Sequence, residues 1–478
     1  MKRLAGTAVA LVALLALGAA TAATATATAT PAGTWSWTAP TEPTITPPVR
    51  DLRRVESMAC AASGRCVIIG RAVVSQSSTL AVSERTSSGW GAVTPLTGLF
   101  SDPSVTGGVI RQTNCAPDGA CVAGGYYFQS GATFAFIDNL DGTGAIPIPG
   151  LAALDVGRDS MASVTSCTSA GNCSAMGTYR DAQSSFRVWV ADQIGGTWGD
   201  ARDVAGFSGA AFPTSMSCGA DGDCVAIGTM TAGSNDGFII ERTGGVWGTP
   251  LFVSTMLPLG LENQLVAVSC PSPAFCLTGG YVSAPTTAMV MTRIDGVWSG
   301  PAPVPGLAAV TAGGASVLTS LSCGAPGSCA ATGWGFTSGG RTTWVADLTD
   351  GSWNDAHELP GVTELGVDDR YPTAVACGAS GVCVLTGSFD VGTNLPDAFF
   401  ASRIDGVWSR ASVVPPLRPE SGAPGDSSSS AACTSISCSI GGTYNNAGVE
   451  IGWVMDLVFT PTPTTTTPAG PVAPAFTG

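Results

Sequence analysis

Short runs of apolar residues, some alternating with polar ones, recur along the chain between stretches rich in Gly, Asp and Thr. The runs 237–240, 288–291, 343–346 and 398–401 are of this kind. Runs of four to eight such residues bounded by turn residues are typical of β-strands. The pattern therefore predicts an all-β chain made of many short strands.

Asp-Gly turns follow these runs and lead to a tryptophan, as at 295–298, 350–353 and 405–408. Asp-Gly between two strand-like runs is a strong signal for a hairpin. Each of these segments therefore predicts a strand, a tight turn and a second strand that opens on Trp.

The sixteen cysteines recur at nearly regular intervals along the chain. They form eight pairs: Cys60 and Cys66, Cys115 and Cys121, Cys167 and Cys173, Cys218 and Cys224, Cys270 and Cys276, Cys323 and Cys329, Cys377 and Cys383, Cys433 and Cys438. Successive first members lie 51 to 56 residues apart, which is the period of a tandem repeat. The chain thus contains eight related units.

A glycine stands four residues after the second cysteine of every unit. These glycines are Gly70, Gly125, Gly177, Gly228, Gly280, Gly333, Gly387 and Gly442. A glycine kept at one position in all copies indicates a backbone requirement, such as a bulge or a close approach between strands.

One unit therefore holds four strands, A to D. Strand A ends at the first cysteine, strand B starts at the second, strand C is the apolar run and strand D opens on Trp. Four antiparallel strands in about fifty residues form a propeller blade. The fold class predicted is an all-β, eight-bladed propeller over residues 33–459.

The ends of the chain predict how the ring closes. Tryptophan occupies the strand D position at Trp90, Trp198, Trp247, Trp298, Trp353 and Trp408. Unit two departs from this pattern with Asp141-Gly142-Thr143-Gly144, and unit eight has no Trp there. The segment 33–35 (Gly-Thr-Trp) matches 196–198, so we expect the N-terminal strand to pair with 452–458 and cover both open sheet edges.

The order of apolar strand, Gly-Gly, apolar strand and Asp-Gly-x-Trp, seen from Leu277 to Trp298, resembles kelch-type repeats. The form Ser-Cys, five residues, Cys, three residues, Gly resembles secreted bacterial propellers of the sialidase-like Asp-box group. The resemblance covers nearly all of the chain after its N-terminal segment and implies fold alone. An Asp-box reads Ser-x-Asp-x-Gly-x-x-Trp, whereas Asp, Gly and Trp are closer together here, so sialidase activity is not implied.

The two terminal segments predict export. Residues 1–22 have a basic start, an apolar run and small residues, as a secretory signal does, and an Ala/Thr-rich linker follows at 23–32. No later stretch is long and apolar enough to span a bilayer. The tail 460–478 is rich in Thr and Pro, as semi-rigid spacers are. Its end faintly resembles a sortase motif, so wall association remains an alternative to free secretion.

The cysteines of an exported chain predict disulfides, because an oxidising compartment preserves them. Five residues between two cysteines suit a hairpin whose flanking positions face each other at about 4.5 to 5.5 Å, so pairing within each unit is expected. Unit eight, with one residue fewer, should have a tighter loop. Zinc sites usually place paired cysteines closer in sequence, and no metal site is predicted.

Charge and residue usage narrow the function. The net charge is −14, and −16 (−14 minus 2) without Lys2 and Arg3, which disfavours nucleic acid as a partner. No lysine follows Lys2, and His357 is the only histidine. With all cysteines assigned to disulfides, no catalytic residue and no cofactor are predicted. Residues 221–223 (Asp-Gly-Asp) indicate a turn more simply than a calcium loop.

Binding residues are expected on the face that carries the B–C loops and the D-to-A connections, because these vary between units. Charged residues gather in those connections although only 11% of the chain is charged. The predicted binding residues are Arg53, Arg54, Arg158, Asp159, Asp368, Asp369 and Arg370. Aromatic residues near the B–C loops could stack on sugars or pack between blades; they are Tyr127, Tyr179, Trp334, Phe336, Phe389 and Tyr444.

The sequence thus favours a secreted, monomeric binding or scaffold protein that captures a carbohydrate or an envelope protein at the loop face of the channel. An enzyme is the less favoured interpretation. The alternative is a polysaccharide hydrolase or lyase that uses channel-mouth carboxylates, with Asp368 and Asp369 as the best pair. A third interpretation is that the charged residues of these connections have no function and only keep the loops solvated.

Overall fold

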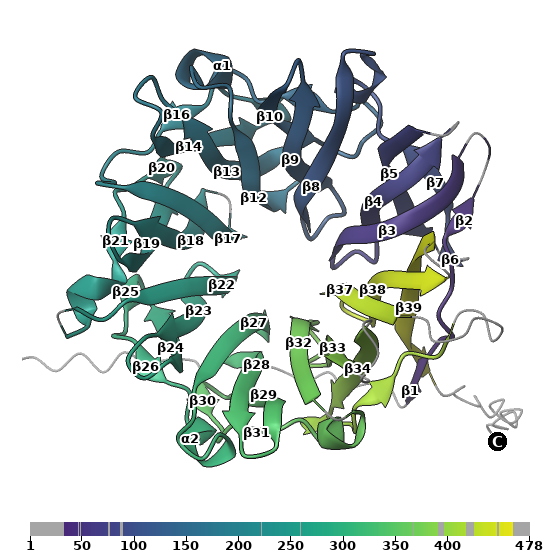
Figure 1. Ribbon diagram of the computed structural model, residues 1–478, viewed down its shortest axis with the longest axis vertical. Coiled ribbons are helices and arrows are strands. Elements are labelled where there is room, and N and C mark those ends of the chain that lie inside the picture. The colour runs from purple at the N-terminus through teal and green to yellow at the C-terminus, as the bar shows by residue number, and fades with distance from the viewer. Residues whose placement is uncertain are drawn as a thin grey trace, which may run out of the picture. The chain divides into compact units, whose positions relative to one another are not determined.

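Eight antiparallel sheets follow one another around a ring in the order of the chain (Figure 1). In this computed structural model, residues 35–459 form one unit, and residues 1–34 with 460–478 form a second. The structure describes residues 33–461 apart from 46, 48, 75–76, 87–88, 221, 259, 367, 391–395, 417–424 and 447–448. The predicted signal segment, the linker and most of the tail lie outside the described residues. The eight sheets confirm the predicted propeller.

Each blade runs outward from the channel in the predicted order A, B, C, D. The inner A strands of blades 1 to 8 are β3 (Val49–Cys60), β8 (Val105–Cys115), β12 (Met161–Ser169), β17 (Ala210–Ala220), β22 (Asn263–Ser272), β27 (Ser316–Ala325), β32 (Asp368–Cys377) and β37 (Gly425–Cys433). The B strands are β4 (Cys66–Val74), β9 (Cys121–Gln129), β13 (Asn172–Arg180), β18 (Asp223–Thr231), β23 (Phe275–Val282), β28 (Ser328–Thr337), β33 (Cys383–Asp390) and β38 (Ser437–Asn446). The C strands are β5 (Ser77–Thr86), β10 (Ala132–Asp138), β14 (Phe186–Ile194), β19 (Asn235–Thr243), β24 (Thr287–Ile294), β29 (Gly340–Thr349), β34 (Pro396–Ile404) and β39 (Val449–Pro461).

Strand D differs from the prediction because it comes in two short pieces that both pair with strand C. The first piece ends on the Trp. The residue after the Trp donates its N–H to a carbonyl of strand C, as Gly199 does to the Asp192 carbonyl at 2.9 Å, and the second piece then pairs with strand C again. The Trp pieces are β6 (Gly89–Trp90), β15 (Thr197–Trp198), β20 (Val246–Trp247), β25 (Val297–Trp298), β30 (Ser352–Trp353) and β35 (Val407–Trp408). The second pieces are β7 (Ala92–Pro95), β16 (Arg202–Asp203), β21 (Leu251–Phe252), β26 (Ala302–Pro303), β31 (His357–Glu358) and β36 (Ser412–Val413).

Blade 2 has β11 (Ile146–Pro147) as its one described outer strand, as its departure from the Trp pattern suggests. Short helical turns connect several blades. They are η1 (Leu99–Ser101), α1 (Leu151–Leu154), η2 (Val253–Met256), α2 (Leu307–Val310) and η3 (Val362–Glu364).

The N-terminal strand closes the ring as predicted. Strand β1 (Gly33–Trp37) lies beside β39 and is the outer strand of blade 8. The centre of the Trp37 ring lies 4.8 Å from the centre of the Phe400 ring of blade 7, and the Thr38 N–H donates to the Asp456 carbonyl at 2.8 Å. The chain then adds β2 (Thr44–Ile45), which pairs in parallel with β7 of blade 1 and was not predicted. One segment therefore joins the last blade to the first.

The repeated glycine fits the predicted close approach. A Cβ atom on Gly70 would lie 1.6 Å from the Arg54 carbonyl oxygen of the inner strand, and one on Gly177 would lie 1.9 Å from that of Met161. Strand A carries a β-bulge at this point, for example after Ala162, which pairs with Gly177. Glycine is required here because the bulge brings the inner strand onto strand B.

All eight predicted disulfides are present, one in each blade, and no cysteine among the described residues is free. The paired Cα atoms are 4.0 to 4.1 Å apart, closer than expected. In the shorter loop of blade 8 the Thr434 hydroxyl accepts the N–H groups of Ile436 and Ser437 at 3.1 and 2.9 Å.

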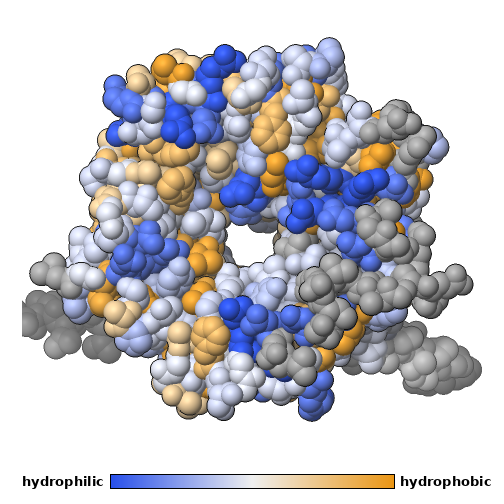
Figure 2. All heavy atoms as spheres, viewed as in Figure 1, coloured by the Kyte–Doolittle hydropathy of each residue, from blue (hydrophilic) through white to orange (hydrophobic). Residues whose placement is uncertain are grey.

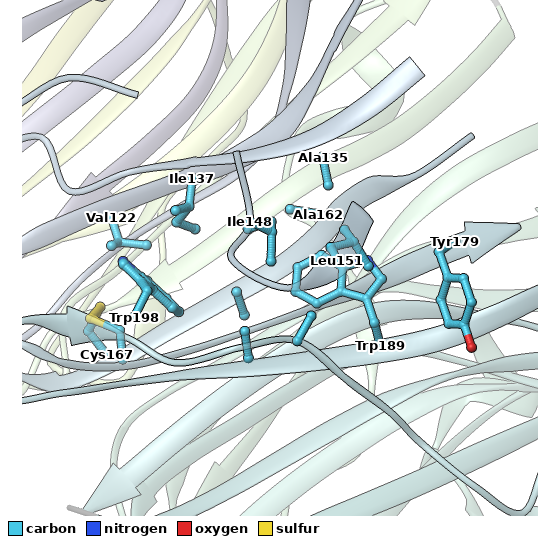
Figure 3. Packing of buried hydrophobic residues seen from close by; sticks show 14 of the residues in the cluster. Val122, Ala135, Ile137, Ile148, Leu151, Ala162, Cys167, Tyr179, Trp189 and Trp198 are labelled. Carbon is cyan, nitrogen blue, oxygen red and sulfur yellow. A yellow bond between two sulfur atoms is a disulfide. The ribbon is translucent and has the colours of Figure 1, made fainter. Parts of the chain in front are cut away.

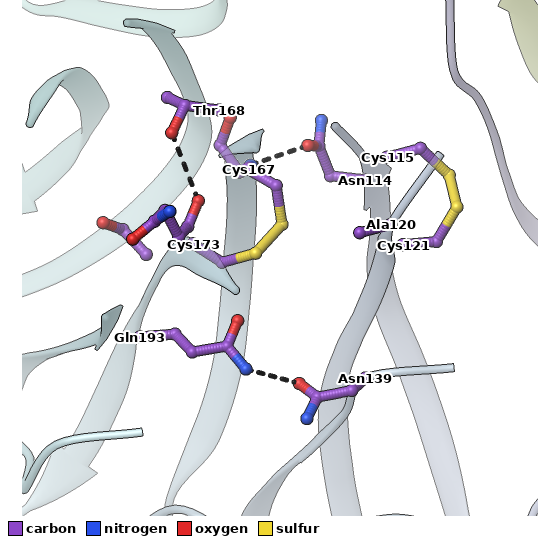
Figure 4. Close-up of a disulfide and its surroundings, with 12 residues drawn as sticks. Asn114, Cys115, Ala120, Cys121, Asn139, Cys167, Thr168, Cys173 and Gln193 are labelled. Carbon is purple, nitrogen blue, oxygen red and sulfur yellow. Dashed lines mark hydrogen bonds between the residues drawn. A yellow bond between two sulfur atoms is a disulfide. The ribbon is translucent and has the colours of Figure 1, made fainter. Parts of the chain in front are cut away.

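The serine that precedes many of the first cysteines links neighbouring blades. Its hydroxyl accepts the N–H of the first cysteine of the next blade, and Asn114 does the same from blade 2 (Figure 4). These bonds run from Asn114 to Cys167 (2.8 Å), Ser166 to Cys218 (3.0 Å), Ser217 to Cys270 (2.9 Å), Ser269 to Cys323 (3.1 Å) and Ser322 to Cys377 (3.0 Å). The Ser-Cys repeat is therefore an inter-blade contact near the channel.

The hydrophobic core consists of eight clusters, each between two neighbouring blades. Figure 3 shows the cluster between blades 2 and 3, where Trp198 lies near Ile137, Ile148 and Val122. Burial of large apolar side chains on both faces of each sheet is the main force that holds the blades together.

Polar contacts connect the outer parts of the same interfaces. At three interfaces an acid near the end of strand C accepts the indole N–H of the next blade's Trp and faces an arginine of that blade, and a fourth interface has the ion pair alone. The indole bonds are Trp247 to Asp192 (3.1 Å), Trp298 to Glu241 (2.6 Å) and Trp408 to Asp347 (3.2 Å). The ion pairs are Arg242 with Asp192 (3.2 Å), Arg293 with Glu241 (2.9 Å), Arg403 with Asp347 (3.2 Å) and Arg85 with Asp456 (3.3 Å).

Between blades 2 and 3 the same contact is made by neutral residues. The Asn139 amide oxygen accepts from Gln193 at 3.1 Å (Figure 4) and from the Trp198 indole at 3.0 Å. A guanidinium is therefore not required for this geometry, and an amide pair replaces the ion pair. The aromatic N–H donor is common to both versions of the contact.

A buried carboxyl in blade 2 gives a pH-dependent prediction. Burial raises the pKa of Asp138 above its ordinary value of 3.8, with Asp141 adding to the rise and the Leu140 N–H opposing it. Glu84 shares the pocket that Asp138 lines, and Arg65 contacts the Leu140 carbonyl. The folded state thus holds this proton more tightly than the unfolded state, so the Asp138 contribution to stability falls as pH rises from 3.8 through the raised pKa.

Asp138→Asn removes the charge and keeps an oxygen for the Leu140 N–H. We expect the variant to have a modestly higher Tm than the unchanged protein at pH 7 and no such gain below pH 3.8. Thermal unfolding followed by circular dichroism across pH checks this. A gain that is the same at every pH would show that the ionisation of Asp138 is not its cause.

Candidate functional site

The predicted binding residues of blade 1, Arg53 and Arg54, have exposed side chains on β3. Arg53 is the extra residue of a bulge, since Leu52 pairs with Ala72 and Arg54 with Arg71. Among the described residues neither guanidinium has a carboxylate within ion-pair distance. Figure 2 shows hydrophilic groups over β3 beside the central opening. These two cations are therefore accessible next to the channel.

The predicted pair in blade 3, Arg158 and Asp159, contacts residues that the sequence did not indicate. The Arg158 guanidinium lies 5.3 Å from the centre of the Phe134 ring. Asp159 forms an ion pair with Arg180 at 3.0 Å, and Arg180 lies 4.1 Å over the ring of Phe186. These residues form a cation and aromatic cluster at the B–C end of blades 2 and 3.

The predicted residues of blade 7 have different positions. Asp369 faces Arg341 of blade 6 at 3.7 Å. Arg370 is buried, and its guanidinium donates to the carbonyls of Gly366 and Thr363, so it supports the connection around η3. The side chain of Asp368 lies outside the described residues. The catalytic alternative based on Asp368 and Asp369 stays a prediction.

Most of the six aromatic residues near the B–C loops pack inside the blades. Tyr127, Tyr179, Phe389 and Tyr444 are buried. The Tyr179 hydroxyl donates to Asp203 at 2.8 Å, and burial together with this bond raises the pKa of Tyr179 to about 12. Of the two remaining residues, Phe336 is exposed and Trp334 is half-buried.

The strongest candidate site is a cluster of three aromatic rings around Arg341, between blades 6 and 7. The guanidinium lies 4.6 Å from the Trp334 ring centre, 5.4 Å from that of Phe336 and 5.8 Å from that of Tyr371. The Phe336 and Tyr371 residues are 43% and 36% exposed, which is unusual for large rings. Asp369 completes the group. We call Trp334, Phe336, Arg341, Asp369 and Tyr371 the aromatic cluster.

The strand pattern explains how the aromatic cluster is assembled. Trp334 and Phe336 alternate on β28, so both side chains project from one face of blade 6. Arg341 lies opposite Phe336 on β29, just after the turn between the two strands. Tyr371 comes from β32, the inner strand of blade 7. Hydrophilic groups gather over the ends of β27 and β32 in Figure 2, beside the opening.

Sequence reasoning missed Arg341 and Tyr371. Arg341 follows Gly339 and Gly340, so its place in a B–C turn could have been recognised. Tyr371 directly follows the charged segment 368–370, whose residues were predicted to bind. Neither residue could be joined to Trp334 from sequence, because they are brought together only by the contact between two blades.

A separate cavity of about 310 Å³ lies on the disulfide face between blades 3 and 4. Its walls include Thr168, Asn172, Ser174, Gln193 and Arg242. The cavity lies away from the loop face where binding was expected. Variation between blades is therefore not confined to the loop face.

The described residues offer little for metal or imidazole chemistry. In that part of the chain, no group of three or more His, Cys, Asp and Glu side chains could hold a metal ion. His357 lies on β31, an outer strand. No described helix is both long and apolar enough to cross a membrane.

Comparison with known proteins gives structural likenesses only. No protein-family model matches the chain, and no curated protein matches it. The β-propeller domain of the trilobed protease from Pyrococcus furiosus is 9% identical over 78% of this chain and 99% of that chain, with a TM-score of 0.42. The subtype N11 neuraminidase-like protein of A/flat-faced bat/Peru (H18N11) is 13% identical over 62% of this chain and 86% of that chain, with a TM-score of 0.32. The Aleuria aurantia lectin, solved with Fucα1-6GlcNAc, is 12% identical over 78% and 99%, with a TM-score of 0.32.

Likenesses of this degree say nothing about function. The prediction of a propeller is confirmed by the eight sheets themselves, and the kelch-type features of the repeats stay a prediction.

Proposed function

We propose that this protein is an extracellular carbohydrate-binding protein that holds a neutral glycan on the aromatic cluster. The observation that carries the proposal is the set of three rings within 5.8 Å of the Arg341 guanidinium, two of them well exposed. Exposed aromatic residues that gather at one place on a rigid scaffold mark binding surfaces.

The chemistry of the aromatic cluster suits a sugar ring. The flat ring faces offer apolar surface to the C–H groups of a pyranose. The Arg341 guanidinium supplies hydrogen-bond donors, and the Asp369 carboxylate supplies acceptors, for hydroxyl groups at the edge of the sugar. One cation and one anion leave the cluster without net charge. Together with the chain's net charge of −14, this favours neutral over acidic glycans.

The proposed location is outside the cell. Eight disulfides in the folded chain suit an oxidising environment and support export by the N-terminal segment 1–22. The accessible cations Arg53 and Arg54, across the channel mouth, are proposed to contact longer glycans. Free secretion as a monomer is the simplest form of the proposal, and wall association through the tail is the other.

Glycan binding gives a direct prediction for two residues. Trp334→Ala removes the ring that lies nearest to the Arg341 guanidinium, and Arg341→Ala removes the group that the three rings share. A buried contact of this kind is typically worth more than about 1.4 kcal/mol, so each variant should bind at least about tenfold more weakly. A glycan array selects the ligand, and calorimetric titration of the purified variants measures the loss.

Phe128→Ala is the control, because Phe128 is an aromatic ring on β9 of another blade with an exposure like that of Phe336 and Tyr371. It should bind like the unchanged protein. Failure of the protein to bind any glycan on the array, or equal affinity of Trp334→Ala and Phe128→Ala, would contradict the proposal. Shortening of a bound polysaccharide in the same samples would favour the hydrolase or lyase alternative.

A further inference from the structure

The interface between blades 1 and 2 holds the acid of the repeated indole contact without its indole. Val82 pairs with Thr94 as Val190 pairs with Arg202, so Glu84 in blade 1 corresponds to Asp192 in blade 3. Asp192 accepts the N–H of Trp247 from the following blade. Glu84 has no such partner, since blade 2 carries no Trp at this position.

The missing indole results from a shorter turn. Four residues, 141–144, separate Leu140 from Ala145 in blade 2, whereas seven residues, 194–200, fill the corresponding place in blade 3. The shorter turn still reaches blade 1, because the Leu99 N–H donates to the Ala145 carbonyl at 2.9 Å. The piece of strand D that would bear Trp is therefore absent, and the strand that follows it keeps its place.

The other members of the contact are retained. Arg65, from the A–B loop of blade 1, forms an ion pair with Glu84, as an arginine of the following blade does with the acid at four other interfaces. The same guanidinium donates to the carbonyls of Leu140 (2.9 Å) and Gly119 (2.8 Å) of blade 2. An acid and a guanidinium thus face each other here as they do at four other interfaces, although this guanidinium comes from the same blade as the acid, and the aromatic N–H donor is missing.

A cavity of about 250 Å³ occupies the place of the indole. Val82, Leu96 and Leu140 supply apolar walls, and the carboxylates of Glu84 and Asp138 supply acceptors. Figure 3 shows the filled version between blades 2 and 3, where Trp198 lies beside Ile137 and Ile148, the counterparts of Val82 and Leu96. A cavity of about 150 Å³ is known to admit a benzene-sized ring, so this one has room for an indole.

We propose that the pocket between blades 1 and 2 binds an indole-type aromatic ring whose N–H donates to Glu84. The ring occupies the space that Trp198, Trp247 and Trp298 fill at their own interfaces. Asp138 faces the same pocket, and the corresponding residues Ala191, Ala346 and Ala401 are apolar. This second carboxylate favours a ligand with a further N–H or ammonium group near the ring. The ring has two sources: a Trp side chain of a polypeptide, or a small indole amine.

Calorimetric titration of the full chain with two probes tests the pocket and separates these sources. The first probe is the capped peptide Gly-Gly-Thr-Trp-Gly, which copies residues 195–199, and the second is tryptamine. The peptide with Phe in place of Trp should bind at least about tenfold more weakly, because it lacks the N–H that meets Glu84. Binding of the peptide alone identifies a polypeptide source, and binding of tryptamine alone identifies a small molecule.

Two point variants and a graft locate the binding. Glu84→Ala should lose at least about tenfold in affinity, whereas Glu364→Ala, which removes an acid from an exposed ion pair, should leave it unchanged. A graft that replaces 141–144 with the seven residues 194–200 should place Trp in the pocket, raise Tm and abolish binding of both probes. Absence of binding by the unchanged protein at millimolar concentration, or undiminished binding by the graft, would overturn the inference.

Discussion

A protein that lacks residues 33–40 is expected to aggregate or to unfold at a far lower temperature than the full chain. The deletion removes β1, the outer strand of blade 8, and leaves β39 with an open edge. It also removes Trp35 and Trp37. Their ring centres lie 5.3 Å from that of Phe459 and 4.8 Å from that of Phe400, respectively. The lost burial of these partly covered rings is worth on the order of 3 kcal/mol before the loss of strand pairing.

The control is a second truncated protein that ends at residue 461 and lacks the Thr/Pro-rich segment that follows. Its Tm and solubility should match those of the full chain, because the ring keeps all of its strands. Thermal unfolding by calorimetry, with light scattering to detect aggregation, measures both chains. Equal stability of the two truncated proteins would mean that β1 does not hold the ring closed.

Arg403→Ala is expected to lower the free energy of unfolding by about 3 to 5 kcal/mol, the typical cost of removing one member of a buried ion pair. The side chains of Arg403 and Asp347 are each only 7% exposed, and their charged atoms are 3.2 Å apart. Burial raises the pKa of Asp347 above its ordinary value, and Arg403 opposes the rise. Without Arg403 the carboxylate would keep the Trp408 indole as a partner but lose its compensating charge.

Another interface of the same ring has uncharged residues in place of this ion pair. Thr292 and Leu348 occupy the corresponding positions between blades 5 and 6, so Asp347→Thr combined with Arg403→Leu should recover much of the loss. Arg410→Ala, which breaks an exposed pair with Glu364, is the control and should change stability little. Urea unfolding measures all three proteins. The explanation fails if Arg403→Ala costs no more than Arg410→Ala, or if the double variant is as unstable as the single one.

The fold could be predicted because the repeat leaves few alternatives. Eight cysteine pairs, eight glycines and the recurring Trp fixed the number of blades, the disulfides and the order of strands within a blade. The glycine position was explained correctly because its cause, an approach between adjacent strands, is local. The break in strand D after Trp was not predicted, since a bulge depends on a single hydrogen bond, such as that of Gly199, rather than on a hydrophobic pattern.

The candidate site was predicted only in part, because it depends on contacts between blades. Arg370 belongs to the same charged segment as Asp369, yet it is buried and holds backbone carbonyls. Tyr179 and Phe389 lie one residue further from the repeated glycine than Trp334 does, so they point to the other face of the strand and pack inside the ring. Sequence places all of these residues at the correct end of a blade, whereas exposure depends on the neighbouring blade.

The inter-blade contacts were missed although the repeats carry a signal for some of them. An acid followed by Arg occurs at 84–85 and 241–242, near the end of strand C. Comparison of the eight units position by position would have revealed it. The partner of each acid could not be read in the same way, because it lies about fifty residues further on, in the next blade.

The proposed glycan site is tested most directly by fluorine NMR of the protein labelled with 5-fluorotryptophan. Trp334→Phe identifies the Trp334 signal by its loss. We predict that the Trp334 signal shifts and saturates during titration with the glycan selected on the array, while the signal of Trp247, held between blades 3 and 4, stays in place. A bound glycan that leaves the Trp334 signal unmoved and shifts other tryptophan signals would contradict the account.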